Sequence, residues 1–589
     1  MRPRNLCLLP ISLVLLSHLS ACSSDSQESR QRGGSGGASL TTTGPGPGAG
    51  GGIIGTGAGG SAGGNQVIEQ PATCDQAVSN RTYVGCDFWP TIVANPVYVD
   101  FDPAVVVANG GTGPAKVTVD GPSGFHQEVT VDAGALQKIL LKWVPDLKGP
   151  EFSVMNTSGG RLDHSVRVDK GAYHMVSDVP VTAWQFNPIE YSKPCHANPT
   201  GADCRSASND ASLLLPTSAM TPNYRVFTFS SRQDGNPTTS FSSVPGGVAI
   251  TATADGTAVA MQFSKDCGAE TNNPPKMDPC LAAGPGIASK NSGEIYDFNM
   301  NAGDVIELIG QWGANFELKN GDLSGSVIVA TKPVQVIAFN AIANLPDSTV
   351  ANADHLEETV LPAEVIGKKY IVVPPTTPNG NAVGHVVRIY GDFDNTHLTY
   401  SPEAPPGAPT TINAGETVQL PYYPKPAMGC NFATDHCMTS VPFVVEGDQP
   451  FAVASFMVGG CLQNMNTDYD GLGDPSMTLA VTPEQFRRSY TFLAPKDYVK
   501  NFADVLVPTG ASVTLDGQTV SGTPTAIGAS GWGYLRLPLG PGNGGVHKIS
   551  TDEGKTLGLQ ISGFGNATSY YYPGGLNLKL ISPPPPIVR

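Results

Sequence analysis

Charged side chains are scarce in this chain of 589 residues. They make up 14% of the sequence, whereas an average globular protein has about 25%. Basic residues are the rarer sign, because 34 Lys and Arg stand against 50 Asp and Glu and leave a net charge of -16. No basic patch offsets this acidic balance, so the composition argues against a nucleic-acid partner.

Long hydrophobic runs are also missing. The apolar run from Leu6 to Leu19 is shorter than the about 20 residues that a membrane-spanning helix needs, and no later run is long enough. Two basic residues, Arg2 and Arg4, precede this run. A basic start, a short apolar stretch and small residues after it are typical of an export signal. We therefore expect residues 1–21 to be a signal peptide.

The segment that ends this signal, Leu19-Ser20-Ala21-Cys22, resembles the lipobox of bacterial lipoproteins. The resemblance implies cleavage before Cys22, a diacylglycerol on its sulfur and a further acyl chain on its amine. Two or three chains anchor a protein stably, since each buried methylene contributes about 0.8 kcal/mol. Ser23 follows in place of Asp, which implies the outer membrane or cell surface. The alternative is a secreted protein in which the cysteine lies there by chance.

Long segments with helical periodicity are absent, whereas glycine (69 residues) and proline (51 residues) are abundant. Residues 22–65 are rich in Ser and then in Gly. Such a segment buries no core, so we expect a disordered, flexible linker behind the lipid anchor. A turn-rich chain of low charge favours extracellular β-structure over a helical bundle.

Cysteine usage agrees with an oxidising compartment. Besides Cys7 and Cys22, most cysteines form couples that are close in the sequence, and we expect each couple to form a disulfide that closes a short loop. The couples are Cys74/Cys86, Cys195/Cys204, Cys267/Cys280 and Cys430/Cys437. Cys461 is left over, and the alternative is that it pairs with Cys430 or Cys437. No C-x2-C or C-x4-C spacing supports a zinc site.

One sequence pattern recurs along the chain. A short polar turn precedes a proline, and apolar residues alternate after it, which indicates a half-buried strand. We interpret each copy as a pair of strands with the proline near the turn. The copies are Tyr173–Asn187 with Pro180, Ser326–Asn340 with Pro333, Phe443–Met457 with Pro450, and a fainter one at His547–Phe564.

A second element recurs between these copies. It starts at an acidic residue, passes through apolar residues to a proline and ends at a tyrosine. It occurs as Asp210–Tyr224, Asp354–Tyr370 and Asp474–Tyr490. The repeat is much longer than the about 20–50 residues of a solenoid, and it suits tandem sandwich modules of about 100 residues.

The predicted fold is therefore all-β, with about four tandem β-sandwich-like units after the signal and the linker. We expect these units to be interlocked through the acidic connecting segments. The predicted units are residues 66–205, 206–350, 351–472 and 473–589.

Several motifs are distinctive as a set. They are Tyr83–Pro90 (YVGCDFWP), Asn209–Pro216, Asp354–Glu358 with Gly367–Tyr370, and Gly473–Met477. Together they resemble bacterial surface proteins that carry the IgG Fc-binding protein N-terminal domain, best over residues 206–495. The resemblance implies an extracellular binding protein. No residue of this chain can be matched to an Fc contact.

Recognised catalytic motifs are absent, since the sequence has no H-E-x-x-H, phosphate-binding loop or nucleotide fingerprint. Asp354, His355, Glu357 and Glu358 would form an acid–base cluster if they met in a cleft. The interpretation that we favour is a solvated stretch at a connection between two units. We therefore expect a protein that is not an enzyme.

One segment has oxygen ligands at the spacing of a calcium loop. Positions 1, 3, 5 and 9 of an EF-hand-like loop are filled, with Gly471 at position 6. These ligands are Asn466, Asp468, Asp470 and Asp474. Position 12 is Met477 in place of the bidentate Glu, so the alternative is a polar turn. Structural calcium is the only cofactor that the sequence suggests.

The sequence thus predicts a non-enzymatic, lipid-anchored surface protein that binds an extracellular glycoprotein, a polysaccharide or a neighbouring cell. Aromatic clusters are candidate binding platforms, although β-proteins more often use aromatics for packing. These clusters are Tyr422-Tyr423, Trp532 with Tyr534, and Tyr570–Tyr572. The alternatives are a structural component of the envelope or of a secreted matrix and, third, a hydrolase on a β-scaffold.

Overall fold

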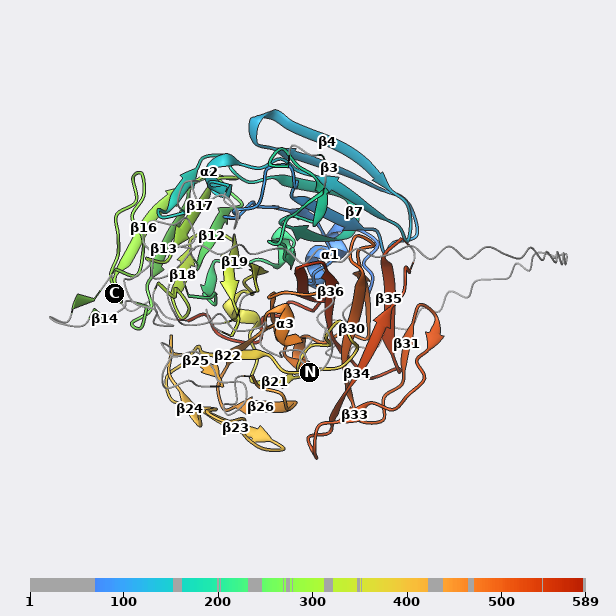
Figure 1. The fold of residues 1–589 in the computed structure, drawn as a ribbon. Helices are drawn as coiled ribbons and strands as arrows, with labels where there is room; N and C mark the ends of the chain where they lie inside the picture. Colours follow the sequence, from blue (N-terminus) through green and yellow to red (C-terminus); the bar gives the residue numbers. More distant parts are fainter. Residues whose placement is uncertain are drawn as a thin grey trace, which may run out of the picture. The chain divides into compact units, whose positions relative to one another are not determined.

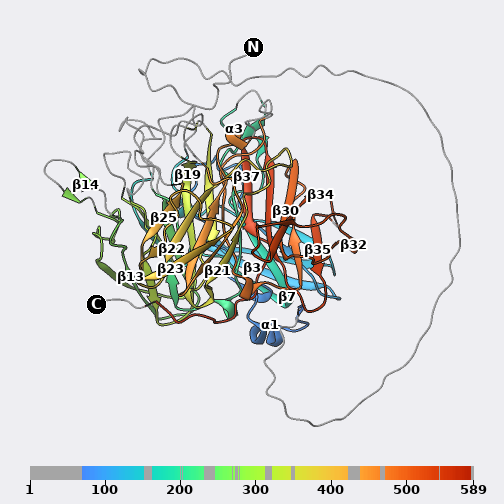
Figure 2. The same ribbon diagram turned by 90° about the horizontal axis from the view of Figure 1, so that it is seen from below.

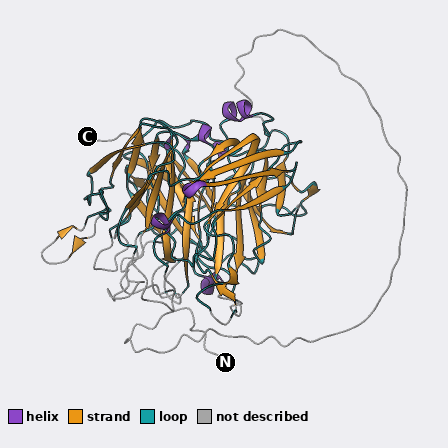
Figure 3. Ribbon diagram, turned by 90° about the horizontal axis from the view of Figure 1, so that it is seen from above, coloured by secondary structure: helices purple, strands orange, loops and turns teal. Residues whose placement is uncertain are grey.

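Antiparallel strands make up almost all of the regular structure, which confirms the predicted all-β fold (Figure 3). Helices are short, and α1 (Cys74–Asn80) is the longest among the described residues. None of the helices in the described ranges has the length and hydropathy to cross a membrane. The computed structural model describes residues 69–585 except 152–161, 199–200, 202, 231–245, 268–269, 272–275, 278, 312–320, 347–349, 351, 422–437, 464–470 and 543.

The strands form four β-sandwiches with one repeated topology. If the strands of a sandwich are counted in chain order, one sheet has the order 1-6-3-4 and the other has the order 8-7-2-5. In the first sandwich the long strand β7 supplies both the sixth and the seventh position. Its strands are β1 (Gly85–Phe88), β2 (Ala104–Ala108), β3 (Ala115–Gly121), β4 (Phe125–Val131), β5 (Leu136–Leu140), β7 (His174–Phe186) and β10 (Ala211–Leu213).

The second and third sandwiches repeat this order in full. The strands of the second sandwich are β11 (Asn223–Arg225), β12 (Gly246–Ala252), β13 (Thr257–Gln262), β16 (Ile295–Met300), β17 (Val305–Ile309), β18 (Val327–Ala330), β19 (Val334–Asn344) and β20 (Ala353–Thr359). Those of the third are β21 (Lys369–Val372), β22 (Val386–Gly391), β23 (Thr396–Ser401), β24 (Thr411–Ile412), β25 (Thr417–Leu420), β26 (Phe443–Gly447), β27 (Phe451–Phe456) and β28 (Met477–Leu479).

The fourth sandwich adds one short strand, β33, outside the same order. Figure 1 shows the labelled strands of each sandwich grouped by colour along the chain. The strands of the fourth sandwich are β29 (Ser489–Leu493), β30 (Lys500–Pro508), β31 (Val513–Leu515), β32 (Gln518–Thr519), β33 (Thr525–Ala526), β34 (Trp532–Leu539), β35 (Val546–Thr551), β36 (Gly558–Gly565) and β37 (Thr568–Pro573).

A few short elements lie outside this plan. Strand β6 comes from the first predicted unit but extends a sheet of the second sandwich, because it pairs with the edge strand β17. Helix α1 contacts β1 and β7, and Figure 2 shows it beside the label of β7. The remaining elements are β6 (Val166–Val168), α2 (Pro145–Lys148), α3 (Gly460–Gln463), the hairpins β8 (Ser192–Pro194) with β9 (Asp203–Arg205) and β14 (Glu270–Thr271) with β15 (Lys276–Met277), and the 3-10 turns η1 (Pro122–Gly124), η2 (Thr217–Ala219), η4 (Ala363–Val365) and η6 (Pro483–Gln485).

The recurring prolines connect the two sheets of a sandwich and do not form hairpins. Pro333 lies between β18 and β19, and Pro450 lies between β26 and β27; the two strands of each pair belong to different sheets. In the first sandwich, β7 continues through Pro180 and pairs with β3 before it and with β2 after it. A turn near Pro180 was therefore wrongly predicted. The missing N–H of this proline is tolerated because it lies between the two paired stretches.

The acidic connecting segments interlock the sandwiches. Each contributes a strand to the preceding sandwich: β10 pairs with β7, β20 with β19, and β28 with β27. The last strand, β37, pairs with β36, and all four of these strands contact one another in part. The predicted unit boundaries before 206, 351 and 473 thus each precede a strand of the preceding sheet. As domain borders they stay a prediction.

The tyrosine that ends each connecting segment has a repeated structural role. Its hydroxyl oxygen accepts a hydrogen bond from the backbone N–H three residues earlier, at 3.4 Å for Tyr224, 3.1 Å for Tyr370 and 2.9 Å for Tyr490. All three side chains are at most 2% exposed. Each tyrosine therefore fixes the chain where it enters the next sandwich, which explains why the residue recurs.

The two ends of the described chain are joined. Thr82, which precedes β1, forms a β-bridge with Asn577, which follows β37. The N–H of Leu578 donates to the carbonyl of Arg81 at 2.8 Å. The described residues accordingly belong to one compact unit.

Candidate functional site

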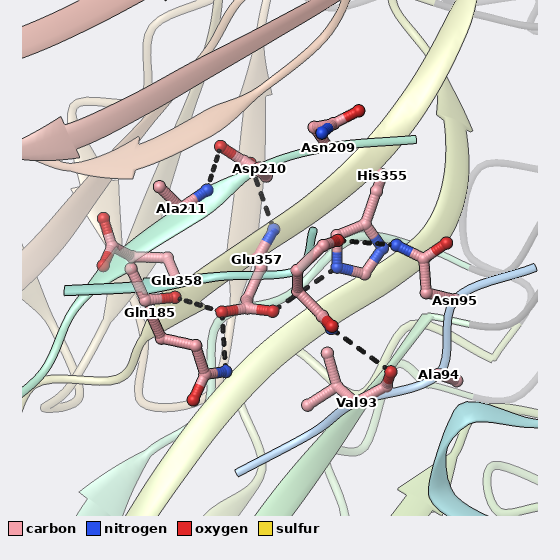
Figure 4. A network of polar contacts seen from close by, with 12 residues as sticks. Val93, Ala94, Asn95, Gln185, Asn209, Asp210, Ala211, His355, Glu357 and Glu358 are labelled. Carbon is pink, nitrogen blue, oxygen red and sulfur yellow. Dashed lines mark hydrogen bonds and ion pairs between the residues drawn. The ribbon is translucent and has the colours of Figure 1, made fainter. Parts of the chain in front are cut away.

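Acidic side chains are fully buried where the last strands of the four sandwiches meet. We name this cluster the buried junction; Figure 4 shows most of it. Each of its carboxylates is at most 2% exposed. The members are Asp210, Asp354, His355, Glu357, Glu358 and Asp474.

Asp210 binds all four sandwiches at once. Its Oδ1 accepts hydrogen bonds from the N–H groups of Ala211 in β10 and Tyr571 in β37, at 2.9 and 3.2 Å. Its Oδ2 accepts from the N–H groups of Glu357 in β20 and Met477 in β28, both at 3.1 Å. Burial raises the pKa of Asp210 well above its ordinary value, and the N–H groups of Glu357, Ala211 and Met477 act in the opposite direction. One side chain thus holds one N–H of each last strand.

Asp354 makes a similar set of contacts. Its Oδ1 accepts from the N–H groups of Asn209 and His355, each at 2.8 Å. Its Oδ2 accepts from the hydroxyl of Thr568 at 2.8 Å and from the N–H of Ser569 at 3.2 Å. These donors belong to the first, second and fourth sandwiches, so Asp354 ties the three together.

Asp474 has fewer donors than the other two aspartates. Its Oδ1 accepts from the N–H of Gly460 at 3.3 Å, and its own N–H donates to the hydroxyl of Ser569 at 2.9 Å. Burial raises the pKa of Asp474 to about 8. Burial, and then the neighbouring Asp474, also raise the pKa of Asp354 well above its ordinary value. Burial with so few donors therefore favours the protonated form of Asp474 at neutral pH.

The expected solvated stretch at residues 354–358 is wrong. Glu357 is buried, and its Oε1 accepts from the amide of Gln185 at 2.9 Å and the hydroxyl of Ser212 at 2.8 Å. Its Oε2 lies 3.5 Å from Nε2 of His355, which is also buried. Polar groups of the first sandwich replace water here, because a buried carboxylate without partners would be very costly.

The buried junction therefore has the composition of an acid–base site, but its carboxylates are buried. Both of the cavities described for this structure, at about 600 Å³ and about 310 Å³, are lined by other residues. Within the described residues, no group of three or more His, Cys, Asp or Glu side chains is placed to hold a metal ion. What the arrangement does chemically is to satisfy backbone N–H groups at the meeting point of four sheets.

The predicted calcium loop falls mostly outside the described residues. Asn466, Asp468 and Asp470 lie there, whereas Asp474 is the buried residue described above. Calcium binding stays a prediction.

Three of the predicted cysteine couples are disulfides in the structure. Cys74–Cys86 joins α1 to β1, Cys195–Cys204 closes the β8–β9 hairpin, and Cys267–Cys280 closes the loop that contains β14 and β15. Cys461 is also disulfide-bonded. Cys22, Cys430 and Cys437 lie outside the described residues.

The described residues of the predicted aromatic clusters are buried or half-buried. Tyr570, Tyr571 and Tyr572 are fully buried, so they are not a surface platform. Trp532 and Tyr534 are half-buried against the core, and Tyr422 and Tyr423 lie outside the described residues.

The larger cavity is a candidate ligand site. It has a volume of about 600 Å³ and lies between the β3–β4 turn, α2, the β6–β7 connection and the β16–β17 turn. It therefore lies at the contact between the first and second sandwiches, and pockets at such borders are preferred ligand sites. Sequence reasoning missed it, because the lining residues come from five separate places in the chain.

Two stacked rings line this cavity. Trp89 and His174 lie with ring centroids 4.1 Å apart and planes 10° apart. Nε1 of Trp89 donates to the hydroxyl of Thr217 at 3.1 Å, and Nε2 of His174 lies 3.0 Å from Oδ2 of Asp87. Burial acts to raise the pKa of Asp87, but hydrogen bonds from His174 and Thr217 hold it below its ordinary value. The stack is therefore fixed from both sides.

Two residues that line the cavity have a strained backbone. Ser123, at the β3–β4 turn, has a φ angle of 58°, and Lys170, before β7, has a φ angle of 54°. Such conformations are rare for residues other than glycine, and they cluster at functional sites.

Comparisons with known proteins identify a family. The two solved structures described next have TM-scores too low to support any argument. No curated protein matches the sequence. An anti-sigma factor domain-containing protein from Clostridium clariflavum is 12% identical over 59% of this chain and 90% of its own, with a TM-score of 0.11. A tetra-tandem repeat in the extending region of a large adhesion protein is 11% identical over 84% of this chain and 99% of its own, with a TM-score of 0.08.

The family evidence comes from the sequence. The model of the IgGFc binding protein family matches residues 210–561. This range starts at Asp210 of the buried junction and ends within β36, so it includes the second and third sandwiches and most of the fourth. With more than half of its length matched, the chain belongs to the IgGFc binding protein family.

Proposed function

We propose that this protein is a lipid-anchored surface protein that binds an extracellular macromolecule, either a glycoprotein or a polysaccharide. The observation that carries the proposal is the family match over residues 210–561. The lipobox at Cys22 and the Gly/Ser-rich segment behind it support a tether at the cell surface. The family name suggests Fc as one ligand to test.

The architecture supports binding over catalysis. The acidic cluster that resembled an acid–base site is buried and bonded to backbone groups, so it offers no route for a hydrolysed substrate. Four sandwiches joined at one junction supply a large, fixed surface. Fixed surfaces bind with a smaller entropy cost than flexible ones.

The test uses the mature chain from residue 22, produced with Cys22→Ser to leave out the lipid. Binding to immunoglobulin Fc, mucin-type glycoproteins and envelope polysaccharides is measured by surface plasmon resonance, with and without calcium. We expect saturable binding to one of these classes. Calcium dependence would support the loop at residues 466–474, and calorimetry without calcium binding up to millimolar concentration would end that idea. If no member of the panel binds, the result would contradict the proposal and favour a structural role in the envelope or matrix.

The anchor has its own test. Cells grown with radiolabelled palmitate should label the wild-type chain, and Cys22→Ala should remove the label and release the protein from the membrane fraction. Unchanged labelling of Cys22→Ala would contradict lipidation at this residue.

A further inference from the structure

The cavity beside Trp89 combines flat rings with hydrogen-bond acceptors. Both Trp89 and His174 line it. The imidazole is the more accessible ring, since 37% of the His174 side chain is exposed, whereas Trp89 is 7% exposed. A flat ring surface stacks on the C–H face of a sugar ring, which is weakly polar, while the sugar hydroxyls need polar partners at the sides.

Carboxylates supply such partners. Asp120, Asp146 and Asp169 line the cavity, and all three are exposed. An ionised carboxylate only accepts hydrogen bonds, so it suits hydroxyl donors. Their negative charges also disfavour a second anion in the same cavity, because like charges repel at short range.

Basic side chains near the cavity have partners. Nζ of Lys170 donates to the carbonyl of Ala302 at 2.6 Å, His126 lies 2.7 Å from Asp120, and Nε of Arg167 lies 3.1 Å from Oδ1 of Asp169. Lys170 keeps its positive charge, because a backbone carbonyl is a neutral acceptor, but three aspartates line the cavity beside this one lysine. The lining is therefore acidic on balance and disfavours a carboxylate, phosphate or sulfate group.

The walls are held in place before any ligand arrives. The N–H of Lys170 donates to Oδ1 of Asp304 at 3.0 Å, and Arg167 bonds the other oxygen of Asp304 at 3.2 Å. These contacts join strand β6 and the β6–β7 connection to the β16–β17 turn of the second sandwich. A site that is ordered in advance loses less entropy on binding.

We propose that this cavity binds a neutral sugar unit, a hexose or an N-acetylhexosamine, of an extracellular glycan. The inference rests on the proposed binding function and names the ligand class of one site. Its volume of about 600 Å³ lies within the range of about 300–1,000 Å³ that is common for small-ligand sites.

The test uses the same mature chain and saturation-transfer NMR with free oligosaccharides. The neutral probes are lactose, mannobiose and diacetylchitobiose, and the acidic probes are sialyllactose and digalacturonate. We expect saturable transfer to at least one neutral probe. The variants His174→Ala and Asp146→Asn should each weaken its Kd at least tenfold. His174→Ala removes the accessible ring, and Asp146→Asn changes an exposed carboxylate with little risk to folding.

His397→Ala is the matched control. His397 is an exposed histidine paired with Asp448 at 3.0 Å, like His174 with Asp87, but it lies in β23 of the third sandwich. The His397→Ala variant should bind the neutral probe with the same affinity as the wild type. A preference for acidic probes, no saturable transfer to any probe, or equal affinities in all variants would overturn the inference.

The two proposals fail in different ways. Binding to a macromolecule without any binding of free neutral sugars would remove the sugar site and leave the proposed function. Sugar binding at the cavity without binding to any macromolecule of the panel would leave the sugar site and contradict the proposed function.

Discussion

Oδ1 of Asp354, in the last strand of the second sandwich, lies 2.8 Å from the backbone nitrogen of Asn209, just before the last strand of the first. The two residues are 145 positions apart in the sequence. This bond and those of Asp210 mean that each sandwich completes its hydrogen bonding with groups from the others. The four modules are therefore expected to unfold together and not one at a time.

Asp210→Ala should destabilise the protein strongly. The change leaves four buried N–H groups without their acceptor. Each buried unsatisfied group costs about 1–3 kcal/mol, so we expect a loss of at least about 4 kcal/mol in the free energy of unfolding. Urea unfolding measures it, with the exposed Asp266→Ala as a control that should stay within about 0.5 kcal/mol of wild type. A small loss for Asp210→Ala would mean that water takes over the acceptor role.

Asp474 should make the protein less stable as the pH rises. Its pKa is raised from 3.8 to about 8 by burial. Between these values the folded protein holds a proton that the unfolded chain releases, so stability falls as the pH increases through this window. The Tm of the wild type should fall more between pH 5 and pH 8 than the Tm of Asp474→Asn, which carries no titrating group there. Parallel pH profiles would show that Asp474 is ionised in the folded state.

His385 should make the protein less stable as the pH falls below neutral. Burial, and then the neighbouring Arg536, lower the pKa of His385 from 6.5 to about 3. Below pH 6.5 the unfolded chain binds a proton that the folded protein lacks, so stability is lost as the pH falls toward 3. His385→Gln should reduce this loss when Tm is measured from pH 7 down to pH 4. A wild-type profile that is unaffected by the change would exclude His385 as a contributor.

The buried ion pair between the second and third sandwiches should couple them. Nη1 of Arg388 lies 2.8 Å from Oδ2 of Asp322, and its guanidinium lies 4.3 Å from the ring centre of Phe229. Arg388→Met alone should cost about 3–5 kcal/mol, because it leaves a buried carboxylate unpaired. The double variant Arg388→Met with Asp322→Leu should cost clearly less than the sum of the single variants. Additive losses in the double-mutant cycle would show that the pair is not coupled.

The strand content and the repeat were predictable because they depend on local patterns. Alternating apolar residues around Pro333 and Pro450 indicate strands whatever the partner strand is. The path through Pro180 was not predictable, because a proline preceded by polar residues is typical of a turn. Only the pairing partners, β3 on one side and β2 on the other, make it a continuous strand.

The burial of Asp354, Glu357 and Glu358 could not be read from their neighbours in the sequence. Charged side chains in a short segment are usually solvated. Here their partners are Asn209, Gln185 and Thr478, more than 100 residues away. The only sequence signal was that an acidic residue recurs at the start of each connecting segment. That signal indicates a shared role for these acidic residues, but it does not indicate that they are buried.

The cavity beside Trp89 was hidden for the same reason. Trp89 and His174 belong to two separate motifs, and Asp120 and Asp146 to neither. Only the folded arrangement of the first two sandwiches brings these residues together.

The Cys74–Cys86 disulfide determines how the protein carries tension. A pull on the chain ahead of Glu69 first meets Arg487, which bonds the carbonyl of Glu69, and then the disulfide, which passes the force into β1 past the loop that holds Thr82. The first contact leads the force into the fourth sandwich, and the disulfide leads it into the first. Peeling the first sandwich away would still require the Thr82–Asn577 bridge to break together with the bonds of Asp210. The described part of the molecule should therefore resist such a pull as one body and yield in a single high-force event.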